Sequence, residues 1–390
     1  MNGETWKQKD RQYIAGTYGR FNVCLAEGKN ATCIDVDGKK YIDFGSGIGV
    51  NSLGYCDAGW VTAVTKQLGR LQHCSNLYYS TPDIELAHRL CGLTGYDKVF
   101  FANSGAEANE CAIKAARKYS FDRYGGKRNK IITLVNSFHG RTVTTLSATG
   151  QDVFHQYFFP FTEGFEFVKA NDMDALTAML DDSVCGIMME LIQGEGGVVP
   201  LEREFVAGVA ELCREKDVAL IVDEVQTGVG RTGKLLACEH YGIRPDIVTL
   251  AKGLGGGLPI GAVLFREDYA KVMGTGTHGS TFGGNPVVCA GALEVLNRVA
   301  DSDFLAEVEK KGIYIRDKLA GIKEIDGVDG LGLMLGVRLK TKQAADAAKA
   351  CVANGLLILT AKTKLRLLPP LTITKEEIDQ GIAVLADVLK

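Results

Sequence analysis

Short apolar segments alternate with helix-like segments through the middle of the chain, and this alternation constrains the fold more than any other feature. Apolar runs predict strands at residues 99–102, 130–135, 186–192, 219–225, 247–251 and 260–265. Helical spacing of apolar residues predicts helices at 107–119 and 204–216. This order indicates an α/β fold with a mostly parallel sheet covered on both faces. Ligands of such sheets bind at the carboxyl ends of the strands.

The two ends of the chain differ from its middle. Residues 32–44 have the pattern of a β-hairpin that turns at Asp37-Gly38. After about residue 300 the pattern changes to helix, strand, helix and a closing helix. We therefore predict an N-terminal segment, 1–50, that joins a small domain, followed by a large domain, 51–295, and the C-terminal small domain, 296–390.

Composition and charge exclude several classes of function. Hydrophobic residues make up 46% of the 390 positions and charged residues 23%, as is usual for a globular enzyme. The formal net charge of −3, without a strongly basic run, argues against nucleic-acid binding. No apolar stretch is long enough to span a membrane, and the N-terminus has no apolar signal core. The 11 cysteines form no Cys-x-x-Cys pair and the 6 histidines no metal-ligand spacing. We expect a reduced, cytoplasmic protein with no metal and no membrane partner.

Lys252 is the first candidate catalytic residue, because it lies between a predicted apolar strand and the glycine-rich segment 253–257. Taken alone, a surface lysine before a flexible turn is the simpler interpretation. Asp223 favours a catalytic role for Lys252 instead, because this acid lies near the end of the preceding predicted strand. An acid and a lysine at neighbouring strand ends can meet at one edge of a parallel sheet. Pyridoxal phosphate requires such a pair, a Schiff-base lysine and a carboxylate for its pyridinium nitrogen.

Other candidates also follow predicted strands. Ser104 is a predicted N-cap, and the free amides after it form an anion site suited to a phosphate. Phe138 can stack on a flat ring, and Arg141 can bind a carboxylate through two hydrogen bonds. Glu195 follows a strand, and Arg366 interrupts an apolar stretch, where a guanidinium needs an anionic partner. Each residue taken alone also has a structural interpretation. Ser104 can be an ordinary cap, Phe138 a core aromatic, Arg141 part of a surface ion pair and Glu195 a solvated acid.

One glycine motif resembles a dinucleotide-binding motif but does not fit its structural context. Residues 228–233 match the dinucleotide fingerprint G-x-G-x-x-G and follow a strand. The acid about twenty residues further on, Asp246, precedes the next strand, whereas ribose recognition needs it at the strand's far end. The glycines after Lys252 are not a nucleotide phosphate loop either, because there the lysine follows the glycines. We therefore do not expect a nicotinamide dehydrogenase.

Six motifs in order carry a family resemblance. They are Asn103-Ser104-Gly105-Ala106-Glu107-Ala108-Asn109-Glu110, Phe138-His139-Gly140-Arg141, Gln193-Gly194-Glu195-Gly196-Gly197, Asp223-Glu224-Val225-Gln226, Ala251-Lys252-Gly253 and Gly279-Ser280-Thr281-Phe282-Gly283-Gly284-Asn285-Pro286. From about Tyr13 to the C-terminus, the chain resembles the class III pyridoxal-phosphate aminotransferases, most closely the acetylornithine aminotransferases. The resemblance implies the fold-type I architecture: a large domain with a mainly parallel seven-stranded sheet, a smaller α+β domain and a homodimer.

The resemblance also implies roles toward the cofactor. Lys252 would form the Schiff base and move the proton, and Asp223 would keep the pyridine nitrogen protonated. The remaining predicted cofactor contacts are Phe138 on the ring, Gln226 on its hydroxyl, Ser104, Gly105 and Ala106 on the phosphate, and Thr281 on the phosphate across the dimer interface.

For the substrate, the resemblance implies transfer of the ω-amino group of N2-acetyl-L-ornithine to 2-oxoglutarate, giving N-acetylglutamate 5-semialdehyde and glutamate, in arginine biosynthesis. Arg141 and Ser280 would contact the acetylated amino acid, and Arg366 the α-carboxylate of glutamate. Glu195 would pair with Arg366 when an ω-amine is bound, since a bare guanidinium beside methylenes is costly. Alternatives are a 4-aminobutyrate, ornithine or succinyl-diaminopimelate aminotransferase, or a non-catalytic protein with this fold.

Two segments depart from the family pattern. Many relatives have proline where this chain has Leu191, and a Gly-His-x-His-Pro stretch where it has Gly54-Tyr55-Cys56-Asp57-Ala58. Neither segment has a catalytic role in this interpretation. The second lies where it can alter packing near the site entrance.

Overall fold

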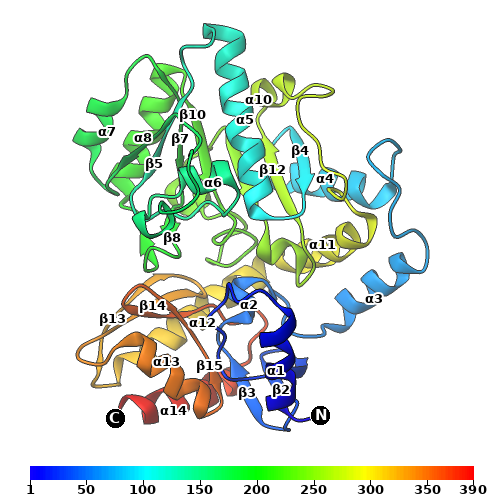
Figure 1. The fold of residues 1–390 in the computed structure, drawn as a ribbon, viewed down its shortest axis with the longest axis vertical. Coiled ribbons are helices and arrows are strands. Elements are labelled where there is room, and N and C mark those ends of the chain that lie inside the picture. The colour runs from blue at the N-terminus through cyan, green and yellow to red at the C-terminus, as the bar shows by residue number, and fades with distance from the viewer.

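Seven strands form the central sheet in the upper half of the computed structural model, which describes residues 1–390 (Figure 1). Their order is β4 (Lys98–Ala102), β12 (Gly261–Phe265), β11 (Ile247–Leu250), β10 (Ala219–Asp223), β7 (Val184–Met189), β5 (Lys130–Leu134) and β6 (Phe165–Val168). The strands run in one direction except β12, which is antiparallel to both neighbours. The predicted mainly parallel seven-stranded sheet is confirmed.

The predicted strands match the observed ones to within two residues at their ends, with two larger differences. The prediction of one strand over 186–192 is wrong, because β7 ends at Met189 and Ile192–Gln193 form a separate strand, β8, paired with β9 (Val199–Pro200). The physical reason is Glu190, whose buried carboxylate accepts the amides of Phe138 and Gly194 and turns the chain. Strand β6 is missing from the predicted strands, because its four residues, Phe165–Val168, include Glu166 and do not form an apolar run.

Helices cover both faces of this sheet. The predicted helices are confirmed as α5 (Gly105–Tyr124), which is longer than expected, and α8 (Arg203–Lys216). On one face, α5 buries five residues at helical spacing against the sheet: Ala108, Cys111, Ala112, Ala115 and Tyr119. On the other face, α8 buries Phe205, Val206, Val209 and Cys213. The small side chains of α5 allow close approach, which sets its N-terminus at the carboxyl edge of the strands.

The lower half combines both ends of the chain (Figure 1). The predicted hairpin is confirmed as β2 (Thr32–Asp35) and β3 (Lys40–Asp43), flanked by β1 (Leu25–Lys29), and β3 pairs in parallel with β15 (Leu356–Leu357). A second sheet has the order β13 (Ile325–Leu331), β14 (Met334–Leu339), β17 (Lys364–Leu367) and β16 (Leu359–Ala361). The helices of this half are α1 (Gly3–Tyr13), α12 (Ser302–Ala320), α13 (Ala344–Ala353) and α14 (Lys375–Leu389). Domain boundaries near residues 50 and 295 stay a prediction, and α11 (Pro286–Val299) runs through the second position.

The remaining short elements connect these layers. They are α2 (Ser46–Gly49), α3 (Ala58–Leu68), α4 (Thr81–Thr94), α6 (Val143–Ala148), α7 (Met173–Met179), α9 (Cys238–Tyr241), α10 (Glu267–Val272) and the 3₁₀ turns Asp152–Phe154 and Lys252–Gly255. The segment that departs from the family pattern has a structural role. Tyr55 donates to Asp43 at 2.7 Å, and Asp57 caps α3 and pairs with Arg298 at 3.0 Å. Leu191, the other departure, is fully buried.

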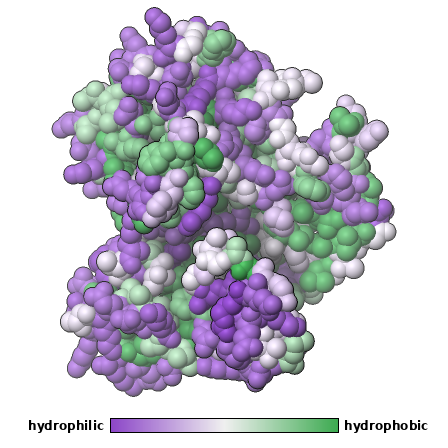
Figure 2. All heavy atoms as spheres, in the orientation of Figure 1, coloured by the Kyte–Doolittle hydropathy of each residue, from purple (hydrophilic) through white to green (hydrophobic).

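The surface in Figure 2 is mostly hydrophilic, with hydrophobic residues gathered on the projecting arm that carries α3. Large exposed apolar side chains in and after this arm include Leu68, Leu77, Tyr78 and Tyr79, the last 97% exposed. No helix combines the length and the apolar character needed to cross a membrane.

Candidate active site

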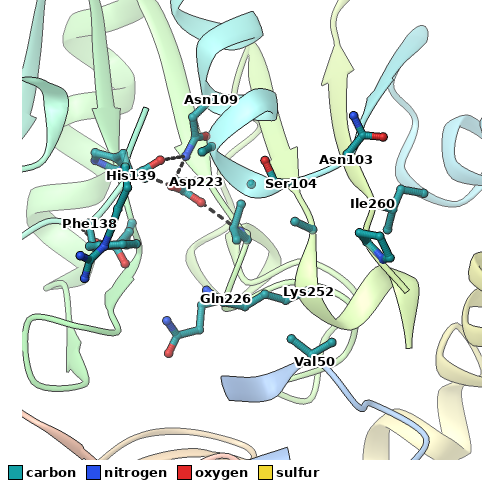
Figure 3. Close-up of a pocket in the computed structure, with 18 of the residues that line it drawn as sticks. Val50, Asn103, Ser104, Asn109, Phe138, His139, Asp223, Gln226, Lys252 and Ile260 are labelled. Carbon is teal, nitrogen blue, oxygen red and sulfur yellow. Dashed lines mark hydrogen bonds and ion pairs between the residues drawn. The ribbon is translucent and has the colours of Figure 1, made fainter. Parts of the chain in front are cut away.

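A cavity of about 510 Å³ opens at the carboxyl ends of β10 and β11 (Figure 3). These strands are parallel neighbours, so Asp223 at the end of β10 and Lys252 two residues beyond β11 lie at one edge of the sheet. The cavity is of the size that holds small ligands. Of the predicted site residues, the structure brings eight together in its wall: Ser104, Gly105, Ala106, Phe138, Arg141, Asp223, Gln226 and Lys252.

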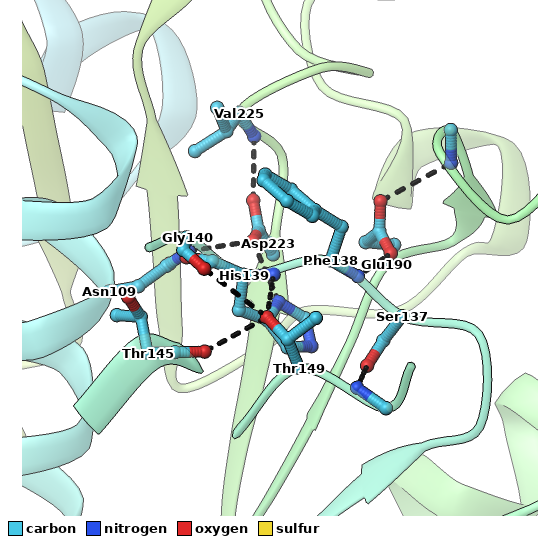
Figure 4. Close-up of polar contacts among 12 residues, drawn as sticks. Asn109, Ser137, Phe138, His139, Gly140, Thr145, Thr149, Glu190, Asp223 and Val225 are labelled. Atoms are coloured by element: carbon cyan, nitrogen blue, oxygen red, sulfur yellow. Dashed lines mark hydrogen bonds and ion pairs between the residues drawn. The ribbon is translucent and has the colours of Figure 1, made fainter. Parts of the chain in front are cut away.

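Asp223 is buried and held by three donors (Figure 4). Its Oδ2 lies 2.8 Å from His139 Nδ1 and accepts a hydrogen bond from Asn109 Nδ2, also at 2.8 Å. Its Oδ1 accepts the amide of Val225 at 3.0 Å. His139 and Asn109 are not among the predicted site residues, although both lie within the family motifs. Together the donors fix the orientation of the carboxylate.

Lys252 has an unusual backbone and environment. Its φ is +40°, in the left-handed region that favours glycine, and such strain concentrates at functional sites. Desolvation lowers the pKa of its amine, and the Asp223 and Glu195 carboxylates oppose this shift. A lowered pKa leaves more of the amine unprotonated near neutral pH, as a nucleophile or proton acceptor requires.

The first turn of α5 supplies an anion site. Ser104 caps the helix through Oγ, which accepts the amide of Glu107 at 3.2 Å. The amides of Gly105 and Ala106 have no protein acceptor, and a helix start favours negative charge. Gly140 lies against this turn, and a Cβ there would be 2.7 Å from Ala106 Cβ. Any larger residue at position 140 would therefore displace the loop that carries Phe138.

Glu190 links the loop that carries Phe138 to the loop that carries Glu195. Its Oε2 accepts the amide of Phe138 at 3.0 Å, and its Oε1 accepts the amide of Gly194 at 3.3 Å. Burial raises the pKa of this carboxyl to about 7. Arg141, in the same loop, is exposed and lies over the ring of Phe154 at 4.7 Å. Both Phe138 and Arg141 thus face the mouth of the cavity from one loop.

Arg366 and Glu195 form an ion pair next to the cavity. Arg366 Nη1 donates to Glu195 Oε1 at 2.6 Å and lies 3.4 Å from Oε1 of Gln226, a residue of the cavity wall. The side chain of Arg366 is 4% exposed, whereas that of Glu195 is 32% exposed. Both charges act on the pKa of Lys252, which places the pair within electrostatic range of its amine.

Ser280 and Thr281 do not line this cavity. Ser280 Oγ accepts a hydrogen bond from Asn103, a residue of the wall, at 3.1 Å. Thr281 is exposed and lies in a neighbouring hollow with Phe282 and Glu107. Within one chain, the structure therefore does not bring Thr281 to the cofactor candidates.

The donor set fits pyridoxal phosphate. Free helix-start amides suit its phosphate, the held carboxylate suits its pyridinium nitrogen, and a lysine of lowered pKa lies in the same wall. A dinucleotide has no comparable site, because Asp246 accepts the amide of Leu220 at 2.9 Å and Arg231 is buried.

Comparison with known proteins decides the family. The class III aminotransferase family profile matches residues 13–389. The chain belongs to the class III aminotransferases. This family is pyridoxal-phosphate dependent. A relative named acetylornithine aminotransferase, from Haemophilus ducreyi, is 52% identical, with 100% of this chain and 99% of that protein covered.

Solved structures agree with this assignment. An ornithine aminotransferase from Toxoplasma gondii, described with partial occupancy of pyridoxal phosphate at its active site, is 36% identical with a TM-score of 0.94, covering 100% of this chain and 94% of that one. An N-acetylornithine aminotransferase from Stenotrophomonas maltophilia is also 36% identical, with a TM-score of 0.85 and coverage of 98% and 97%. The expected fold type and transferase class are thereby confirmed.

Proposed function

We propose that this chain is an acetylornithine aminotransferase, which transfers the ω-amino group of N2-acetyl-L-ornithine to 2-oxoglutarate. One observation carries the proposal: a buried arginine, Arg366, paired with a half-exposed carboxylate, Glu195, beside the lysine of an aminotransferase site. Two alternating donors require such a pair, because only one of them carries a carboxylate next to the reacting amine. Relatives of that name, 39–52% identical across the chain, support the acetylated substrate.

The residues of the cavity would hold pyridoxal phosphate. Lys252 would anchor it, Asp223 would face its ring nitrogen, and the amides of Gly105 and Ala106 would receive its phosphate, with Ser104 beside them. When bound, this cofactor supplies an electron sink for removing a proton from the carbon that bears the amine. Phe138 would stack on the ring and Gln226 would donate to its hydroxyl.

The chain's own residues would then bind substrate and move the proton. Lys252 Nζ, with its lowered pKa, would take the proton from the amine-bearing carbon and return it to the cofactor side. Arg366 would bind the α-carboxylate of glutamate after Glu195 has turned away. With acetylornithine bound, Glu195 would return and neutralise Arg366, while Arg141 and Ser280 would contact the acetylated end.

We further infer a homodimer in which Thr281 serves the cavity of the other copy. The exposed apolar side chains around Tyr79 and the position of Thr281 outside its own cavity support this. Light scattering coupled to gel filtration tests the assembly. Mixing Thr281→Ala with Lys252→Ala tests the shared site. In the mixed dimer, the site with Lys252 receives Thr281 from the other copy, so it should bind the cofactor more tightly than the sites of the Thr281→Ala dimer.

Ornithine is the second candidate substrate, because an ornithine aminotransferase gives a TM-score of 0.95 with this chain. A panel of acetylornithine, ornithine, 4-aminobutyrate and succinyl-diaminopimelate, each with 2-oxoglutarate, separates the candidates by kcat/KM. Acetylornithine should give the highest value. Preference for another amine would reassign the substrate, and no activity with any of them would refute the proposed enzyme.

A further inference from the structure

Arg231 is a buried arginine without an acidic partner. It is 2% exposed, and its Nη1 donates to the carbonyls of Leu333 at 3.1 Å and Pro369 at 2.5 Å. Its Nη2 has no partner, and desolvation lowers the pKa of the guanidinium to about 9. A charge buried in this way is costly. These two carbonyls are the only hydrogen-bond acceptors of its side chain.

These carbonyls lie at the open end of the β14–β17 ladder. Arg366 of β17 is paired with Gly336 of β14, and Leu367 with Leu335. Continuing this register places Leu333 opposite Pro369, three residues beyond Arg366. Proline has no amide hydrogen, so the ladder cannot close there with the usual hydrogen bonds. The guanidinium of Arg231 joins the two carbonyls instead.

The backbone of the two segments is in direct contact as well. Leu333 donates its amide to the carbonyl of Arg231 at 3.0 Å. Gly332 has φ of +51°, and a Cβ there would lie 2.8 Å from that carbonyl oxygen. The turn before β14 thus requires glycine in order to approach the loop that carries Arg231.

The loop that carries Arg231 is itself rigid and follows the catalytic strand β10. Buried Glu224 accepts the amides of Ala237 and Cys238 and the hydroxyl of Thr227, each at 2.8 Å. The same loop carries Gln226, whose Oε1 lies 3.4 Å from Arg366 Nη1. One rigid loop therefore contacts Arg366 itself and the end of its strand.

We propose that Arg231 is a positioning residue for Arg366: by joining Leu333 and Pro369 to the loop after Asp223, it keeps the α-carboxylate clamp aligned with the cavity. The proposal rests on the proposed role of Arg366 as that clamp. Arg231 does not line the cavity. Its loss should loosen Arg366 and should leave Lys252 and the ω-amine end of the site in place.

The test compares the holoenzyme with Arg231→Met and Arg231→Lys, measuring each half-reaction by single-turnover absorbance of the bound cofactor. Arg231→Met should raise the apparent Kd for glutamate about tenfold or more, as expected for lost hydrogen bonds around a charged clamp, and that for the ω-amine no more than about twofold. Arg231→Lys should give a smaller change of the same kind. Arg316→Met is the matched control, because Arg316 donates to two carbonyls, of Val328 and Gly330, away from the cavity. It should not separate the half-reactions.

Equal losses in both half-reactions, or none, in a variant with a normal cofactor spectrum would overturn the role of Arg231. If Arg231→Met does not fold, Arg231→Lys decides by the same ratio. The wild-type enzyme tests the proposed function separately, since the ratio can be measured with whichever ω-amine it accepts. An Arg366→Met variant with an unaltered glutamate half-reaction would refute Arg366 as the clamp and, with it, the positioning role of Arg231.

Discussion

Replacing Arg366 by methionine should separate the two half-reactions. The change removes the guanidinium and keeps an unbranched apolar stem in the strand. Arg366 is 4% exposed, so its charge is largely shielded from water. Removing one partner of a buried, hydrogen-bonded charge pair costs about 2–5 kcal/mol. We therefore expect kcat/KM for glutamate to fall roughly 30- to 4,000-fold.

The ω-amine half-reaction should lose far less. Without Arg366, Glu195 is left as a carboxylate that is 32% exposed and can be hydrated. Because Glu195 can be hydrated, leaving its carboxylate unpaired should cost at most about 1 kcal/mol, or roughly fivefold in rate. The complementary variant Glu195→Ala should leave Arg366 free, favour glutamate and weaken the ω-amine half-reaction. The two variants should therefore shift the ratio of half-reactions in opposite directions.

Stopped-flow spectra of the bound cofactor report each half-reaction when one substrate is supplied alone. Lys364→Met is a suitable control, because Lys364 is on the same strand and pairs with an acid, Asp329, at 2.8 Å. It should leave the ratio unchanged. If Arg366→Met reduces both half-reactions by the same factor, Arg366 supports folding or cofactor placement, and the two-donor switch is wrong for this protein.

Three further changes test the rest of the site. Lys252→Ala should stay folded, bind the cofactor less tightly and lose several powers of ten in turnover; near-normal turnover would contradict its role. Asp223→Asn should slow both half-reactions steeply at saturating cofactor, with Asp223→Glu milder; unchanged single-turnover rates in both would make Asp223 only structural. Glu190 has a folded pKa near 7, above its ordinary value of 4.5. Its stabilising contribution is thus present below about pH 4.5 and lost as pH rises to 7, so Glu190→Gln should flatten the pH dependence of the unfolding temperature between these values. Equal slopes in wild type and variant would exclude this.

Local patterns predicted most strands of the sheet and the edge at which Asp223 and Lys252 lie. Asp223 and Lys252 could be expected to meet because each ends a short apolar run, and parallel neighbours present their carboxyl ends together. The start of α5 could be found from Ser104 as an N-cap. These features depend on a few consecutive residues, which a single sequence displays.

Contacts between distant residues could not be predicted in this way. His139 and Asn109 reach Asp223 across 84 and 114 positions, and neither differs in type from an ordinary core polar residue. Arg231 lay in a glycine motif that suggested a nucleotide loop, and only the tertiary structure shows its contacts with Leu333 and Pro369. Whether Thr281 completes a second copy's site depends on a surface that one chain does not define.

The exposures of Arg366 and Glu195 indicate which of them moves between substrates. Arg366 lies inside a paired strand and is buried. Displacing it would break ladder contacts and leave a charge without a partner. Glu195 is partly exposed and stands between Gly194 and Gly196-Gly197, the last with φ of +116°, so rotation exposes its carboxylate to water at little cost. An enzyme that must accept a carboxylate in one half-reaction and methylenes in the other is best served by a fixed cation and a mobile anion. The opposite arrangement would require the buried charge to move in every cycle.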